Sequence, residues 1–331
     1  VGRFDPQALA ARTGIALERV ARLAREIAAE PRALVYGRVG ACTQEYGGLT
    51  IWLIYCLNLL TGHLDSEGGM MFAEPAVDLT RAYGSKGHYG KFRSRVRKLP
   101  EFGNELPVAT LADEILTEGR GQVRALISFA GNPVLSTPNG RQLDRALESL
   151  EFMVSVDPYL NETTRHADLI LPPTSPLEHS HFDIALAGFA VRNVAKYSPP
   201  LFARPPGALH DHEILAELTL RLGTRPGMER SIAAAKGSVA RRLGPDGLLD
   251  WMLRTGVYGQ ENRGALRLMG RLPGFGAMRR QLEAPDRKPR GLSLKRLMAA
   301  PHGVDLGPLE QGLVRRLGSP DRRIQLTPDG H

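Results

Sequence analysis

Short apolar runs and polar loops alternate along the middle of the chain and predict strands joined by helices. Ala125–Ala130 and Phe152–Val156 are apolar runs of strand length, and they end in polar loops at Gly131 and Asp157. A helix starting near Pro138 is expected between them, and a short helix and a third strand, ADLILP, are expected after them. In a parallel α/β sheet both loops lie at the carboxyl edge, where ligands bind. The pattern therefore predicts a nucleotide-like binding half-domain.

The amino-terminal part shows a second helix–strand–loop–helix pattern. Helices are expected over residues 5–14 and Leu17–Ala29, the second with apolar residues on one face. A strand over Ala33–Tyr36, a turn over Gly37–Gly40 and an apolar helix over Leu49–Leu60 should follow.

The remaining segments are less regular. Helices are expected over Val108–Thr117 and Asp211–Leu222, and residues 224–270 form an Arg-rich helical pattern. We expect irregular or loop structure over residues 75–107, 172–206 and 272–291, and a connecting arm over residues 301–320. The last ten residues resemble a strand entering a turn, so we expect the chain to be a fragment of a longer polypeptide.

Length and composition fit a globular protein with two domains. The chain has 331 residues, of which 42% are hydrophobic and 24% charged. No apolar run approaches 18 residues, so no membrane span is expected. The two cysteines, Cys42 and Cys56, form no CxxC motif, which excludes an iron–sulfur cluster built from this chain alone. We expect both to be core residues, and their low number favours a cytoplasmic location.

The net charge of +8 is unevenly distributed. Residues 81–98 contain seven lysines and arginines and no acid. Such a run binds an anionic cofactor, an acidic partner or nucleic acid, or is simply a solvated loop, and we favour the solvated loop. No nucleic-acid partner is expected, because no helix-turn-helix, zinc-finger or aromatic RNA-binding motif accompanies the run.

The sequence Gly131-Asn132-Pro133 lies between a predicted strand and a predicted helix. Glycine lets the backbone approach a ligand closely, and the asparagine amide both donates and accepts hydrogen bonds. The nearby helix N-terminus favours an anion such as pyrophosphate. The same three residues are also common in ordinary turns, so they are weak evidence alone.

Asp157 ends the next strand, where a carboxylate accepts hydrogen bonds from ribose hydroxyls or from the N–H edge of guanine. The alternative is an Asp-Pro turn stabilised by its own side chain. Asn161, Glu162 and Thr163 add further polar groups a few residues later. Together with the Gly131 loop they favour one shared ligand.

No catalytic residue can be identified from the sequence. His179, His181 and Asp183 have the composition of a metal site and would share one side of a strand. No further ligand cluster lies nearby and a turn after Pro176 is equally consistent, so no metal ligand is expected here. The sequence contains neither the GxSxG motif of serine nucleophiles, nor a Cys–His nucleophile pattern, nor the HExxH motif of zinc peptidases.

Two longer segments resemble the molybdopterin oxidoreductases of the dimethyl sulfoxide reductase family, which includes formate dehydrogenases and nitrate reductases. The first is GNPVLSTPNG…FMVSVDPYLNETTRHADLILPPTSPLEH, and the second is GRVGACTQEYGGLTIWLIYCLNLLTGHLDSEGG. The late segment PHGVDLGPL resembles the arm that leads to the family's C-terminal barrel. The likeness is good over residues 1–225 and looser beyond, and it rests on the order and spacing of the motifs.

The resemblance implies a bis-(molybdopterin guanine dinucleotide) cofactor with molybdenum or tungsten. It also implies a small-molecule substrate, an electron-transfer partner and a 4Fe–4S cluster in an N-terminal part that this chain lacks. The guanosine diphosphate arms of the molybdopterin cofactor would lie on two related α/β domains. The implied fold is α/β, with two Rossmann-like doubly wound layers, each incomplete, and a helical insertion.

Carried over by position, Gly131, Asn132 and Pro133 would line a phosphate or ribose. Asp157 would bind the guanine, and the residues from Asn161 through Glu162 to Thr163 would support that nucleotide. Gly40 and Gln44 match a Gly/Gln loop near the cofactor.

Several positions depart from the family's pattern. His63 lies where family members usually have asparagine, and the segment Leu64–Glu67 matches loosely. The N-terminal cysteine cluster and the residue that ligates the metal have no counterpart here. Cys42 does not match the ligand position, so no metal ligand is assigned.

We therefore expect four parts: residues 1–115 as the end of one cofactor-binding domain, 116–225 as a second that binds a guanine dinucleotide arm, 226–300 as a helical insertion and 301–331 as an arm. The expected function is the central portion of a molybdopterin-dependent oxidoreductase, formate dehydrogenase-like as the first guess. The alternatives are a non-catalytic scaffold subunit of a redox complex and an unrelated nucleotide-binding transferase.

Overall fold

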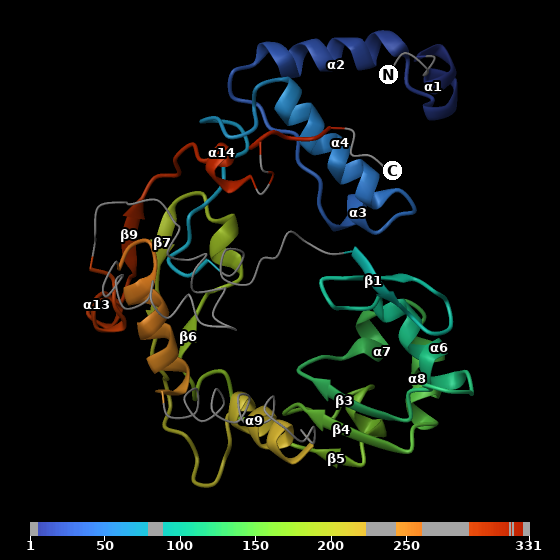
Figure 1. Ribbon diagram of the computed structural model, residues 1–331, viewed down its shortest axis with the longest axis vertical. Helices are drawn as coiled ribbons and strands as arrows, with labels where there is room; N and C mark the ends of the chain where they lie inside the picture. Colours follow the sequence, from blue (N-terminus) through green and yellow to red (C-terminus); the bar gives the residue numbers. More distant parts are fainter. Residues whose placement is uncertain are drawn as a thin grey trace. The chain divides into compact units, whose positions relative to one another are not determined.

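The computed structural model describes residues 6–78, 89–222, 243–259, 291–317, 319 and 321–326. The chain divides into two compact units, each described by itself. Unit 1 comprises Val1–Pro75, Ala185–Val194 and Asp305–His331, and unit 2 comprises Ala76–Ile184 and Ala195–Val304. Figure 1 shows a mixed α/β structure with several helices and short strands.

A three-stranded parallel sheet organises unit 2. Strands β3 (Ala125–Phe129), β4 (Phe152–Val156) and β5 (Leu169–Ile170) follow one another in the order β3-β4-β5. The register pairs Ala125 with Phe152 and Phe129 with Val156, so β3 and β4 end side by side. The predicted parallel sheet is confirmed, with β3 one residue shorter than expected and β5 reduced to two residues of the expected ADLILP strand.

Helices α6 (Leu111–Leu116) and α8 (Gly140–Glu148) pack against one face of this sheet (Figure 1). Leu143, Ala146 and Leu147 recur at helical spacing on α8 and are buried against Met153 of β4. On the opposite face Ile127, Phe129, Phe152 and Leu169 are 44–50% exposed, whereas Val154 and Val156 are buried. The structure thus shows a small parallel sheet, and the two Rossmann-like doubly wound layers, each incomplete, remain an expectation.

Several shorter elements complete unit 2. The predicted helix α9 (Asp211–Leu222) is confirmed with the expected bounds, and residues 243–255 form a helix inside the expected Arg-rich segment. The other parts of that segment, and the expected loop over residues 272–290, lie outside the described residues. The smaller elements are η1 (Val108–Thr110), α7 (Pro133–Ser136), η2 (Thr164–His166), β6 (His181–Phe182), β8 (Tyr197–Ser198) and α13 (Leu294–Met298).

The irregular structure expected over residues 75–107 is wrong in part, because β1 (Tyr89–Arg93) and β2 (Pro100–Phe102) pair antiparallel. Arg95 fixes this hairpin to α6 by donating to the carbonyls of Glu114 and Thr117, and its guanidinium lies 3.3 Å from the buried Glu114 carboxylate. Part of the basic run is therefore structural. Its residues 81–88 lie outside the described part of the chain.

Unit 1 contains the predicted amino-terminal helices. Helices α1 (Pro6–Thr13), α2 (Leu17–Ala29) and α4 (Gly47–Leu60) confirm the expectations within two residues. The turn expected at Gly37–Gly40 is wrong in part, because Val39–Cys42 form the short helix α3. Gly47 permits the tight turn between α3 and α4, since a Cβ there would lie 1.9 Å from the Cys42 carbonyl oxygen.

The strand expected over Ala33–Tyr36 is not formed. Instead, the amide of Asn58 on α4 takes the place of a neighbouring strand: Val35 N–H donates to Asn58 Oδ1 at 3.0 Å, and Asn58 Nδ2 donates to Val35 O at 2.8 Å. Asn58 is fully buried and also donates to Ile54 O. Its side chain satisfies backbone groups that a sheet would otherwise pair.

The predicted connecting arm is partly ordered in regular elements, and the irregular stretch over residues 172–206 contains short strands. Strand β9 (Val304–Gly307) pairs with β7 (Asn193–Ala195), and β6 pairs antiparallel with β8. A helical turn, α14 (Leu313–Arg316), follows β9, and Asp65 Oδ2 accepts from the backbone N–H groups of Gly312 and Leu313 at 2.8 Å. Elements of two to four residues are too short to show a hydrophobic period, which is why the pattern missed them.

Throughout the described ranges, every helix is too short or too polar to cross a lipid bilayer.

Replacing Asn58 tests its structural role. We expect Asn58→Ala to lower the free energy of unfolding by about 2–4 kcal/mol, because two backbone groups of Val35 lose their partners inside the protein. Urea unfolding measures the change. Gln44→Ala, which removes an exposed amide from the same unit, is the control and should cost less than about 0.5 kcal/mol. Equal effects of the two substitutions would contradict the assignment.

Candidate functional site

The carboxyl edge of the parallel sheet in unit 2 gathers the polar residues singled out in the sequence. Because Phe129 and Val156 are paired, the loop that starts at Ala130 lies beside Asp157. Ala130 N–H donates to Val156 O at 3.0 Å, which extends the pairing one residue into the loop. The expectation that both loops share one edge is confirmed.

Asn132 joins the two loops. Its Nδ2 donates to Glu162 Oε2 at 2.5 Å, and its Oδ1 accepts from Thr163 Oγ1 at 2.8 Å. Thr163 Oγ1 in turn accepts from the backbone N–H of Val134 at 3.1 Å. The hydrogen bond from Asn132 lowers the pKa of the Glu162 carboxyl below its ordinary value, so Glu162 is held as a carboxylate.

Asn161 has a structural task in the same cluster. Its Oδ1 accepts from the backbone N–H groups of Thr163 and Thr164 at 2.9 and 3.0 Å, and its own N–H donates to Thr164 Oγ1. These bonds cap the single turn η2. Asn161 therefore shapes the loop that presents Glu162 and Thr163.

Asp157 forms the Asp-Pro turn that was one of the two interpretations made from the sequence. It is 6% exposed, and its Oδ1 accepts from the backbone N–H of Tyr159 at 2.8 Å, as expected for an Asp-Pro turn. Among the residues that the structure describes, none donates to Oδ2. The turn therefore uses one of the two carboxylate oxygens.

The Gly131 loop leaves space at the sheet edge. Ala130 adopts a left-handed conformation with φ 48°, and Pro133 is the first residue of α7. A Cβ added at Gly131 would come no closer than 3.8 Å to another atom, so the protein itself does not require glycine there. At Gly140, by contrast, a Cβ would lie 2.0 Å from Val134 O, so that glycine is needed for packing.

Gly40 and Gln44 belong to unit 1. Gly40 lies in α3, where a Cβ would meet nothing within 4 Å, and the exposed Gln44 donates to Ala41 O at 3.1 Å. Neither residue lines a cavity that lies in the same unit.

That cavity has a volume of about 1410 Å³ and was missed by the sequence analysis. Its walls include the charged Arg32 and Glu67, the rings of Tyr36 and Tyr55, and the Gly68–Phe72 backbone. Gly68 has φ 86°, and the Arg32 stem packs close against it. Paired glycines after an apolar helix were the available signal, and they indicated a loop that other chain segments approach closely.

His63, which departs from the expected asparagine, is a buried structural residue. Its Nε2 lies 2.8 Å from Glu30 O and its Nδ1 lies 2.7 Å from Thr61 Oγ1. The ring therefore links the end of α4 to the end of α2, so the substitution at this position supports the fold of unit 1.

The histidines considered as metal ligands lie in unit 2. His210 forms an edge-on contact with His179 and stacks on His212, with ring centroids 6.1 and 5.5 Å apart. His181 is in β6, and it takes part in neither of these two ring contacts. Over the described ranges, no three His, Cys, Asp or Glu side chains have the arrangement needed to hold a metal ion.

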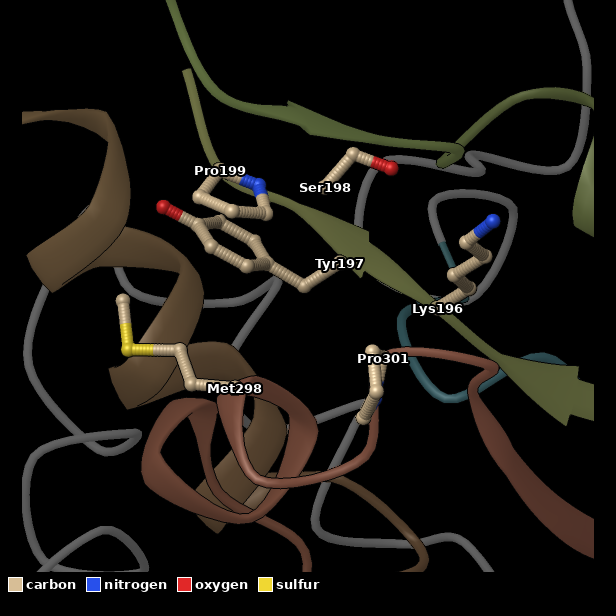
Figure 2. Close-up of a pocket in the computed structure, with 6 residues that line it drawn as sticks. All are labelled: Lys196, Tyr197, Ser198, Pro199, Met298 and Pro301. Atoms are coloured by element: carbon tan, nitrogen blue, oxygen red, sulfur yellow. The ribbon is translucent and has the colours of Figure 1, made fainter. Parts of the chain in front are cut away.

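A second cavity of about 430 Å³ lies beside β8 and α13. Figure 2 shows Tyr197, Pro199, Met298 and Pro301 around it, with Lys196 directed to the other side of the strand. Tyr197 donates from its hydroxyl to Asp246 at 2.7 Å, and burial raises the pKa of this phenol. Since that hydroxyl is already bonded, the cavity wall offers mainly apolar surface.

The histidine contacts predict a pH dependence. Burial, assisted by the charge of Arg204 and by His212 and His179, outweighs the opposing Glu213 and lowers the pKa of His210. The unfolded state therefore takes up a proton first, so stability is complete above pH 6.5 and falls as the pH drops below it. Urea unfolding at pH 7.5 and pH 5.5 measures this loss.

In His210→Asn the loss on acidification should be smaller, while His302→Asn, which changes an exposed histidine, should leave it unaltered. An undiminished loss in His210→Asn would contradict the assignment.

Comparison with known proteins identifies relatives of the chain. The sequence model of the molybdopterin oxidoreductase family matches residues 10–219, more than half of the chain. The assimilatory nitrate reductase catalytic subunit of Bacillus subtilis is 34% identical over 105 residues, which cover 31% of this chain and 14% of that protein. The thiosulfate reductase molybdopterin-containing subunit of Salmonella typhimurium is 26% identical over 197 residues, covering 54% and 26%.

A third relative is the menaquinone reductase, molybdopterin-binding-like subunit, of Nitratidesulfovibrio vulgaris. It is 24% identical over 233 residues, which cover 70% of this chain and 30% of that protein. The chain thus spans less than a third of the length of each of these three relatives.

Proposed function

Because the chain belongs to the molybdopterin oxidoreductase family, we propose that it is the central portion of an enzyme that catalyses two-electron redox of a small substrate. In this proposal, residues 116–225 bind a guanine dinucleotide arm of a bis-(molybdopterin guanine dinucleotide) cofactor. Residues 1–115 are the end of a second cofactor-binding domain, 226–300 an insertion and 301–331 an arm. Each α/β layer would be completed as a doubly wound sheet by further chain.

The observation that supports the nucleotide site is the buried Asp157 at the carboxyl end of β4. One of its oxygens holds the turn at Tyr159, and the other receives no hydrogen bond from the described residues. Guanine presents two adjacent N–H donors, which a carboxylate accepts and which adenine lacks. The open space at Gly131 admits the sugar and phosphate beside the Asn132 cluster.

The residues present therefore fit the nucleotide part of the cofactor. Asn132, Glu162 and Thr163 are fixed by their mutual hydrogen bonds before any ligand arrives, so little ordering is required on binding. When bound, the metal of such a cofactor supplies the two-electron chemistry, and an iron–sulfur cluster outside this chain would pass the electrons to a partner.

The class of substrate is proposed from the relatives rather than from the site. Relatives named as nitrate, thiosulfate, arsenate and trimethylamine-N-oxide reductases favour reduction of a small oxidised compound. The formate dehydrogenase-like reaction expected from the sequence stays a prediction, as does the cytoplasmic location.

One comparison favours a second candidate function. The menaquinone reductase subunit, described as molybdopterin-binding-like, shares similarity over 70% of this chain. A non-catalytic scaffold subunit that keeps the fold is therefore the alternative. It predicts neither bound metal nor bound nucleotide, whereas the catalytic proposal predicts both.

Metal and nucleotide content separates these candidates. We expect the full-length protein, purified from a host that makes the cofactor, to contain molybdenum or tungsten and about two GMP per metal. Elemental mass spectrometry measures the metal, and acid release measures GMP. Absence of both metal and GMP would favour the scaffold subunit, and Asp157 would then have only its structural role in the turn at Tyr159.

Substitution of Asp157 tests the guanine contact. Asp157→Asn keeps an oxygen for the Tyr159 N–H but replaces the second acceptor by a donor. Asp157→Ala removes both. We expect each to lower GMP content, since each unpaired guanine donor costs about 1–3 kcal/mol. Asp211→Ala, which removes a half-buried aspartate at the start of α9 in the same unit, is the control. Full GMP occupancy in Asp157→Asn would refute the assignment.

A further inference from the structure

Asp144 on α8 binds the loop between β4 and β5 but does not itself contact Asn132, Glu162 or Thr163. Arg165 Nη2 donates to the two oxygens of Asp144 at 2.7 and 2.8 Å, and His166 Nε2 lies 2.6 Å from Asp144 Oδ1. The His166 side chain is only 12% exposed. Two neighbouring residues of the loop thus meet one carboxylate, which fixes both the position and the rotation of the loop.

The charges in this contact are complementary. An ionised carboxylate only accepts hydrogen bonds, so His166 donates from Nε2 to Asp144 at 2.6 Å. The hydrogen bond from His166, followed by that from Arg165, lowers the pKa of Asp144 below its ordinary value. Asp144 is therefore ionised at neutral pH.

The contact is connected to the nucleotide edge by one short rigid segment. Arg165 and His166 belong to η2, whose first residue, Thr164, is fully buried beside the equally buried Thr163. The N–H of His166 donates to Thr163 O at 3.2 Å. Thr163 donates to Asn132 Oδ1. A shift of η2 must move Thr163, and with it the hydrogen-bonded partner of Asn132.

We propose that Asp144 is a positioning residue, which acts through Arg165 and His166 to hold Asn132 and Thr163 where the nucleotide meets them. The inference rests on the proposed function, because it assigns the nucleotide to this edge. The paired side chains are partly exposed, so the contact adds little to global stability, and its effect is on local geometry.

The test compares variants of the cofactor-free full-length protein with GDP as the probe in calorimetric titration. Asp144→Ala should weaken GDP binding about tenfold, because Thr163 and Asn132 are then no longer held in the positions from which they contact the nucleotide. Asp144→Glu, which restores the carboxylate, should recover most of the affinity. Glu151→Ala is the matched control, since it removes an ion pair with Arg124 at the opposite, amino edge of the same sheet.

Hydrogen exchange provides a readout that does not depend on the ligand. The amides of residues 163–167 should exchange faster in Asp144→Ala but not in Asp144→Glu or Glu151→Ala. If the wild-type protein binds GDP and Asp144→Ala binds it equally well, or its exchange is unchanged, the positioning role is overturned while the nucleotide site stands. If the wild-type protein binds no GDP, the proposed nucleotide site fails, and the inference fails with it.

Discussion

The parallel pairing of β3 with β4 is the constraint on which the candidate site depends. Backbone hydrogen bonds fix the register of the two strands, so both end at the same level and their loops lie side by side. Ser128 and Ser155, paired in that register, also share a hydrogen bond of 2.6 Å between their hydroxyls. Without this register, the Gly131 loop and Asp157 would be unrelated turns.

The side chains at that edge differ in how much of their hydrogen-bonding capacity the protein itself uses. Asp157 uses one oxygen for its turn, and Glu162 uses one oxygen for Asn132. Asn161, in contrast, spends its side-chain oxygen entirely on η2. Residues that appeared equivalent in the sequence therefore differ: Asp157 and Glu162 each keep one oxygen for the proposed nucleotide, whereas Asn161 holds the loop itself.

The glycines divide in a similar way. Gly47 and Gly140 are required by the protein's own packing, because a Cβ at either would lie within about 2 Å of a carbonyl oxygen. Gly131 meets no such obstacle, so its small size is available to a ligand rather than to the fold. This contrast supports the placement of the nucleotide at the β3 loop.

The sequence by itself determined the helices and strands that have enough residues to show a hydrophobic period. It predicted α2, β4 and α9 with their observed bounds, and placed Asp157 and Asn132 at one edge. The family resemblance, confirmed over residues 10–219, also followed from the order of short motifs. Local periodicity and strand order are properties of neighbouring residues, so a sequence reveals them.

Only the tertiary structure decided which partner each polar group takes. Asn58 pairs with the backbone of Val35 in place of a strand, and Asp144 of α8 binds Arg165 in the loop that contains Thr163. Arg95, from the basic run, donates to the carbonyl of Thr117 at the end of α6. Each of these contacts joins residues far apart in the chain, and no local pattern specifies them. Their geometry arises only when tertiary packing brings these polar groups within hydrogen-bonding distance.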